Sequence, residues 1–171
     1  WRTMSPRLAD GREITIRPIR PDDKRRLAAG HALMSPETQR MRYHAPKPHL
    51  TDADLRFLTE VDGVDHVAYI AVAAGGPDVA LGVGRFVRDR ARPDTAEFAI
   101  VVADPFQGAG IGRAIAARLA DAAVERGIRR FTATVLHENM KVRRLLTRIS
   151  RTLAEARWSD GAGELVFELA A

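Results

Sequence analysis

A glycine-rich stretch in the middle of the chain has the residue types and spacing of a binding site. Residues 107–113 read Gln-Gly-Ala-Gly-Ile-Gly-Arg, after an apolar run at 96–103 and before an alanine-rich run that favours a helix. Glycines allow turns that a side chain would block, and they let a ligand approach the backbone. The free N–H groups and the dipole of a first helical turn attract phosphate. The order of strand, glycine turn and helix therefore predicts a pyrophosphate cradle.

Two other phosphate motifs fit this stretch poorly. A P-loop needs Lys followed by Ser or Thr after its last glycine, whereas Arg113 and Ala114 follow Gly112 here. The dinucleotide fingerprint needs G-x-G-x-x-G, and the spacing here is G-x-G-x-G. A magnesium-nucleotide hydrolase and a dinucleotide enzyme are therefore disfavoured. A strand-to-helix turn that binds no ligand is the remaining alternative.

Glu97 is the only charged side chain in the apolar run at 96–103. Strand alternation places it on one face with Ala99 and Val101. An amine reaches an active site at neutral pH mainly as ammonium, which is not a nucleophile, and a nearby carboxylate can remove that proton directly or through water. Glu97 is therefore a candidate general base. The alternative is a solvated or ion-paired carboxylate near the start of a strand.

Asn139 is a second candidate, at the start of a predicted helix. It is either an N-cap, a position that asparagine fills well, or a hydrogen-bonding partner for a ligand arm rich in amides. Tyr43 and His44 precede a proline-containing loop and could border an acceptor site, with surface packing as the alternative. His137 could act as a base but stands alone in a predicted loop.

The predicted elements that position these residues alternate between strands and helices. Their order is β-α-α-α-β-β-β-α-β-α-β-β, which predicts a mixed α/β domain and not a doubly wound parallel sheet. Helices are predicted from 21 onward and at 35–44, 51–61, 114–126 and 139–149, and strands at 13–17, 66–73, 79–87, 96–103, 131–136, 152–158 and 164–170.

The composition limits the class of protein. The 171 residues predict one domain, 1–171, with a sizeable core, and a hydrophobic fraction of 46% disfavours disorder. The absence of cysteine excludes disulfides, zinc-thiolate sites and a cysteine nucleophile, and is compatible with a cytoplasmic location. No apolar run approaches the roughly 18–20 residues of a membrane span and no signal-peptide pattern is present, so no membrane partner is expected.

The charge suits an anionic ligand. The chain has 27 basic and 22 acidic residues, a net charge of +5, which is compatible with a cofactor such as CoA. The basic residues do not form a stripe with interleaved aromatics, so nucleic acid is not an expected partner. The sequence starts at Trp1 and not at Met, which is compatible with a piece of a longer protein.

Two motifs resemble one known site. The pattern Gln107-x-x-Gly110-x-Gly112 after a strand, and the pattern Asn139-x-x-Val142-x-x-Leu145-Leu146 on a later helix, resemble the acyl-CoA site of the GNAT superfamily of N-acetyltransferases over residues 12–150. Segments 34–38, 50–54 and 96–99 are similar to the bacterial Pat-type protein-lysine acetyltransferases within that superfamily.

The resemblance implies a fold, a reaction and a set of site residues. The fold would be a single GNAT-like domain with a central, mostly antiparallel mixed sheet flanked by helices. Acetyl-CoA would donate an acetyl group to a primary amine, which would be a protein lysine or alternatively a small amine. The amine would attack the thioester directly and no metal would be needed. The resemblance is also compatible with an oligomer. Glu97 would be the general base. The cofactor-binding residues would be Val101, Val102 and Ala103 along pantetheine, Gln107, Gly108, Ala109, Gly110, Ile111, Gly112 and Arg113 at the pyrophosphate, and Asn139 at the pantetheine region.

One position departs from the family pattern. Many members have a tyrosine, which protonates the leaving thiolate, where this chain has Leu146. Leucine cannot donate a proton, so the thiolate would leave unaided or take a proton from water. The usual pair of glycine and an aromatic after that helix is replaced by Ser150 and Arg151. These departures leave a non-catalytic acyl-CoA-binding or sensing domain as an alternative function.

Overall fold

The computed structural model describes residues 6–76 and 78–170. Residues 1–5, 77 and 171, which the sequence analysis assigned to the same domain, lie outside the described residues. The helices are α1 (Lys24–Ala32), α2 (Pro36–Tyr43), α3 (Asp52–Thr59), α4 (Ile111–Glu125) and α5 (Met140–Ile149), with 3-10 turns η1 (Pro21–Asp23) and η2 (Asp104–Phe106). The strands are β1 (Ile14–Pro18), β2 (His66–Ala73), β3 (Gly82–Arg88), β4 (Thr95–Val102), β5 (Arg130–Leu136), β6 (Ser150–Ser159) and β7 (Ala162–Leu169). The predicted order of helices and strands is confirmed.

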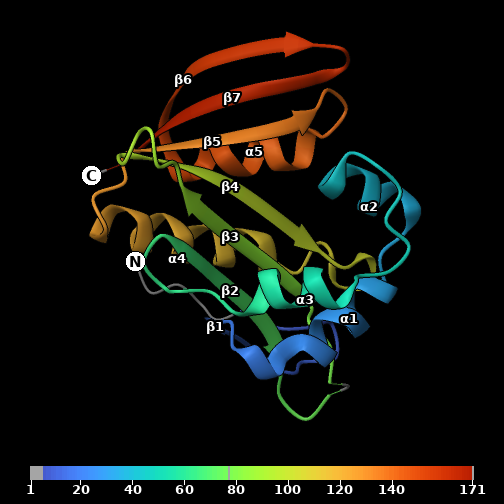
Figure 1. Cartoon of the computed structure of the whole chain (residues 1–171). Coiled ribbons are helices and arrows are strands. Elements are labelled where there is room, and N and C mark those ends of the chain that lie inside the picture. The colour runs from blue at the N-terminus through green and yellow to red at the C-terminus, as the bar shows by residue number, and fades with distance from the viewer. Residues whose placement is uncertain (1–5, 77, 171) are drawn as a thin grey trace.

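One seven-stranded sheet organises the molecule, in the order β1-β2-β3-β4-β5-β7-β6. All neighbours are antiparallel except β4 and β5, which are parallel. The predicted mostly antiparallel mixed sheet is therefore confirmed. The sheet has α1 and α3 on one face and α4 and α5 on the other (Figure 1).

The two parallel strands separate halfway along their length. Their pairing runs only from Thr95↔Arg130 to Glu97↔Thr132, although β4 continues to Val102 and β5 to Leu136. Beyond Glu97, β4 therefore keeps its partner β3 and has no ladder to β5. This separation opens the sheet at its centre and creates the site described below.

The core lies on both faces of the sheet. On the α4 face, Phe98 of β4 is buried together with residues of β3, β5, β7, α4 and α5. Gly84 of β3 allows α4 to approach, because an added Cβ would lie 2.6 Å from Ile115 Cγ2 and 2.9 Å from Leu119 Cδ1. On the opposite face, a smaller apolar cluster joins α1 and α3 to β2 and β3.

Two predicted boundaries were wrong by three residues. The strand predicted at 79–87 begins at Gly82, because the N–H of Ala80 is donated to Arg26 of α1 and not to a neighbouring strand. The helix predicted from 114 begins at Ile111. Its N-cap, Gly110, has φ of 83°, a left-handed conformation that glycine adopts without strain and that starts the helix directly after the turn.

Candidate active site

A cleft of about 1120 Å³ lies where β4 and β5 separate. Its walls come from α2, from β4 and the glycine turn, from β5 and from α5. The volume is slightly above the usual range for small-molecule sites, about 300–1,000 Å³. It brings together residues that are far apart in the sequence, from Ser35 to Arg148.

Glu97 lies at the point where the β4–β5 pairing ends. Its side chain is exposed and lines the cleft, whereas its neighbour Phe98 is buried on the α4 face. Among the described residues Glu97 forms no ion pair, so its carboxylate is open to a ligand. Arg42 of α2 lies nearby; burial lowers the pKa of Arg42, and the charges of Tyr43 and Glu97 partly oppose that effect.

The glycine turn presents backbone donors to the cleft. The N–H groups of a first helical turn have no partner within the helix, and Ile111, Gly112 and Arg113 form the first turn of α4 and line the cleft. Gly108 has φ of 85° and also lines it. The turn thus has the backbone arrangement of an anion site.

Gln107 connects the two walls of the cleft. Its Nε2 donates to the carbonyl oxygen of Val102 at 3.1 Å, and its Oε1 accepts from Lys141 Nζ of α5 at 2.8 Å. The side chain therefore holds the end of β4 beside the start of α5.

The structure places most, but not all, of the predicted cofactor residues at the cleft. Val101, Val102 and Asn139 line it together with the glycine turn. Ala103 is buried and uses its N–H on Leu81 and its carbonyl oxygen on Phe106, and Ala109 packs against the α4-face core. Neither alanine lines the cleft.

Asn139 has the geometry of an N-cap, which is one of the two roles that the sequence analysis left open for it. Its Oδ1 accepts from the N–H of Val142 at 3.3 Å. Leu146, four residues after Val142, is fully buried in the α4-face core and does not line the cleft. Leu145 and Arg148 do line it.

The histidine and tyrosine candidates separate into two groups. Tyr43 and His44 line the cleft from the end of α2. His137 does not; its ring meets Trp158 edge-on, with ring centroids 5.1 Å apart.

Several cleft residues were missed by the sequence analysis. Lys141, Arg144 and Arg148 line the α5 wall. Their spacing of three and four residues places them along one helix face, so the sequence held a signal for them. Arg42 and Glu138 had no such signal, because they reach the cleft from separate segments that only the tertiary fold brings together.

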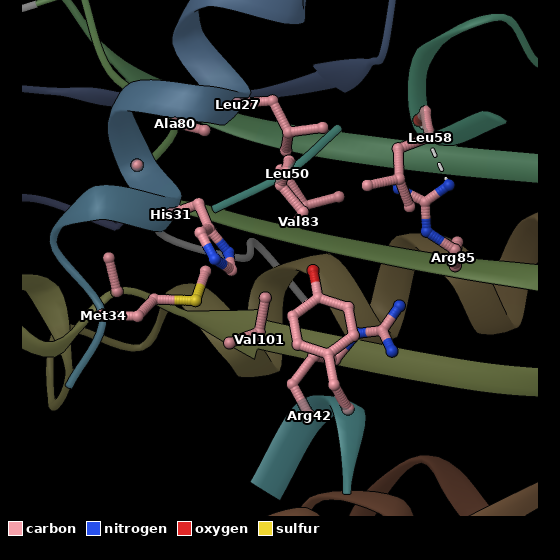
Figure 2. A pocket seen from close by; sticks show the side chains of 14 residues that line it. Leu27, His31, Met34, Arg42, Leu50, Leu58, Ala80, Val83, Arg85 and Val101 are labelled. Atoms are coloured by element: carbon pink, nitrogen blue, oxygen red, sulfur yellow. Dashed lines mark hydrogen bonds between the residues drawn. The ribbon is translucent and has the colours of Figure 1, made fainter. Parts of the chain in front are cut away.

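A second cavity of about 20 Å³ lies behind the cleft on the α1 and α3 side, with room for about one water (Figure 2). Arg42, Tyr43 and Val101 separate the two spaces. Arg85 is buried there and donates to the carbonyl oxygen of Leu58 at 3.1 Å, at the end of α3. Burial, and then repulsion from Arg42, lower the pKa of Arg85 to about 9.

The part of the chain that the structure describes has no group of three or more His, Asp or Glu side chains arranged to hold a metal ion. None of its helices combines the length and the apolar character that crossing a membrane requires.

The comparisons with known proteins agree with this geometry. Residues 13–150 match the family described as Acetyltransferase (GNAT) domain. The chain is 36% identical over 140 residues to Acetyltransferase Pat of Mycolicibacterium smegmatis, with 81% of this chain and 41% of that protein covered. It therefore spans about two fifths of the length of that relative.

Solved structures share the fold. The GNAT domain of S. lividans PAT superimposes with a TM-score of 0.84 and 33% sequence identity, covering 97% of this chain and 95% of that one. The fold also resembles yncA of Salmonella typhimurium, solved with its cofactor acetyl-CoA, with a TM-score of 0.69 and 19% identity, covering 91% and 92%. The family match and the similarity to Pat together show that the chain belongs to the GNAT family of acetyltransferases.

Proposed function

We propose that this protein transfers the acetyl group of acetyl-CoA to a primary amine, with a protein lysine as the acceptor and Glu97 as the general base. One observation carries the proposal: a single cleft holds a carboxylate that forms no ion pair with any described residue, a first helical turn with free backbone N–H groups, and the separated edge of β4. The carboxylate suits an amine acceptor, the N–H groups suit a pyrophosphate, and the strand edge suits a pantetheine arm.

The residues present fit acetyl-CoA as the donor substrate. The N–H groups of Ile111, Gly112 and Arg113 suit the pyrophosphate. Lys141, Arg144 and Arg148, on the opposite wall, add positive charge for an anionic ligand. Val101 and Val102 belong to the part of β4 that has no ladder to β5, so their edge suits pairing with the amides of pantetheine. The similarity in fold to a structure that contains acetyl-CoA supports the same assignment.

Ala103 and Ala109 take a smaller part in this proposal than the sequence predicted. Both backbone groups of Ala103 are bonded within the protein, and Ala109 packs against the core. We propose that they shape the end of β4 and the turn and do not contact the ligand directly. Asn139 caps α5 and could still offer its amide nitrogen to the pantetheine region.

The chemistry needs one base and no covalent enzyme intermediate. The carboxylate of Glu97, directly or through water, takes a proton from the acceptor ammonium. The neutral amine attacks the thioester carbon and the C–N bond forms. The C–S bond then breaks, the sulfur carries away the electron pair, and the second proton of the attacking nitrogen passes to water. Leu146 is fully buried, so in this proposal the thiolate leaves unaided or is protonated by water.

The resemblance to Pat-type enzymes supports a protein lysine as acceptor, and a small amine is the alternative. The wall of α2, with Tyr43 and His44 at its end, would face the acceptor. The departure at Leu146 keeps a third function open, a domain that binds acyl-CoA without transferring the group.

One experiment separates the three functions. The protein is incubated with acetyl-CoA and a panel of cell-lysate proteins, and in parallel with polyamines and amino-group antibiotics, and the products are mapped by mass spectrometry. Acetylated lysines at defined protein sites support the proposal. Turnover on small amines alone supports the alternative substrate, and tight CoA binding without any turnover supports the sensing function.

A further inference from the structure

Helix α2 forms a wall of the cleft but has almost no hydrophobic anchor. Its single buried residue is Gln39, which is polar. Its Met41 and Tyr43 face the cleft, and Tyr43 also lies against His31 of α1, with ring centroids 5.8 Å apart. Helices of this length are unstable alone and depend on tertiary contacts. The position of α2 therefore depends on polar contacts with the rest of the site.

The first polar contact joins the start of α2 to the β4 side of the cleft. Asp104, in the 3-10 turn before the glycine turn, accepts from the N–H of Ser35 at 2.8 Å and from Thr38 Oγ1 at 3.1 Å. Desolvation raises the pKa of Asp104, but these hydrogen bonds outweigh it and hold that pKa below its ordinary value. The carboxylate thus stays ionised and holds the start of α2 through two hydrogen bonds.

The second polar contact joins the middle of α2 to the other side. Arg40 Nη2 donates to Glu138 Oε1 at 2.6 Å. Glu138 directly precedes Asn139, at the end of the β5 wall. The two side chains are 45% and 48% exposed, so water and salt weaken this pair far more than a buried one.

We propose that the Arg40–Glu138 pair is a latch that holds α2 across the mouth of the cleft and controls how fast CoA leaves. Arg40 and Glu138 are positioning residues in this account, and Asp104 is the attachment about which α2 opens. Because Asp104 lies on the β4 side and Glu138 on the β5 side, α2 bridges the two strands where they separate (Figure 1). The latch rests on the proposed function, since CoA is the ligand that it retains.

The test measures CoA release by stopped-flow fluorescence, with an excess of unlabelled CoA to capture a labelled analogue. The variants are Arg40→Gln, Glu138→Gln and the charge exchange Arg40→Glu with Glu138→Arg. Arg92→Gln is a matched control, because Arg92 forms an exposed pair with Asp89 at 2.9 Å outside the cleft. Melting temperatures of all variants show that they are folded.

We expect each single variant to release CoA about 1.5- to fivefold faster, the range for an exposed pair. The charge exchange should restore slow release, and Arg92→Gln should have no effect. Release from the wild type should accelerate with salt toward the rate of the single variants. Unchanged release in both single variants, or no recovery in the charge exchange, overturns the latch while leaving the proposed function in place. A wild-type protein that binds no CoA overturns both.

Discussion

At the scale of single residues, the glycines of the turn differ in what a side chain would meet. Gly110 has φ of 83°, so any side chain there strains the backbone. At Gly112 an added Cβ would lie 3.6 Å from Val102 Cγ2 and 3.9 Å from Leu145 Cδ2, which are ordinary contacts. Gly112 is therefore the position where a charge can be added to the turn with the least effect on folding.

The first prediction is that Gly112→Asp abolishes CoA binding. The carboxylate adds negative charge and bulk where the pyrophosphate should bind, so it repels the ligand. Calorimetry should detect no binding, while the melting temperature stays near the wild-type value. Gly110→Asp should also abolish binding, but with a loss of stability from the strained backbone. A folded Gly112→Asp protein with unaltered CoA affinity would show that the pyrophosphate assignment is wrong.

The second prediction concerns the missing tyrosine. Leu146 is fully buried and does not line the cleft, so a tyrosine there must fit a ring and a hydroxyl into packed core. Overpacking of this kind typically costs about 1–3 kcal/mol. Leu146→Tyr should therefore lower the melting temperature and leave kcat unchanged or reduced. A tenfold rise in kcat would mean that a side-chain acid reaches the sulfur and that the unaided departure of the thiolate is wrong.

At the scale of elements, local signals explain the starts of α2 and α3, whereas the predicted start of α4 was wrong. Ser35 caps α2 by accepting from the N–H of Thr38, with Pro36 at its first position, and Thr51 and Asp54 form a capping box at the start of α3. The separation of β4 from β5 could not be predicted this way. It depends on how two strands distant in the sequence pair, and neither strand carries a local signal of where that pairing stops.

The third prediction concerns the packing of α3 on β2 and β3. His66 Nε2 accepts from Arg85 Nη1 at 3.0 Å, and burial, followed by the charge of Arg85, lowers the pKa of His66 to about 4. Its ordinary value is about 6.5. Between these values the unfolded chain binds a proton that the folded chain does not. The contribution of His66 to the free energy of unfolding is therefore fully present above about pH 6.5 and is lost as the pH drops toward 4.

Melting temperatures measured across this pH range should show that loss in the wild type. His66→Gln cannot titrate, so its profile should be flatter between pH 6.5 and 4. His49→Gln, at an exposed position, is the control and should follow the wild type. An equally steep profile in His66→Gln would mean that His66 is not the group responsible.

At the scale of the whole molecule, the sequence predicted the fold class and the main features of the site but not its enclosure. The glycine turn, Glu97 and Asn139 each carry a recognisable residue type at a recognisable place, and the cleft contains all three. The latch joins residues 98 positions apart and the Asp104 attachment spans 69 and 66. Such contacts arise from the packing of the complete domain, so no local sequence pattern predicts them. The sequence aligns Leu146 with the family's tyrosine, but the packing of the complete domain directs its side chain into the core.

The proposed role of Glu97 as the base for acetyl transfer within this cleft is tested by the variant Glu97→Gln. Glutamine keeps the size of the side chain but does not accept the proton. Steady-state kinetics with acetyl-CoA and the amine acceptor, and CoA affinity by calorimetry, should be measured from pH 7 upward, with Glu125→Gln at the exposed end of α4 as the control.

We expect kcat of Glu97→Gln to fall by about 10²–10⁴-fold at neutral pH. CoA affinity should change little, because the glycine turn lies beyond the end of β4. The loss should shrink as the pH rises, since more of the acceptor is then already neutral. Full activity of Glu97→Gln at neutral pH would contradict the account, and His44, which also lines the cleft, would become the candidate base.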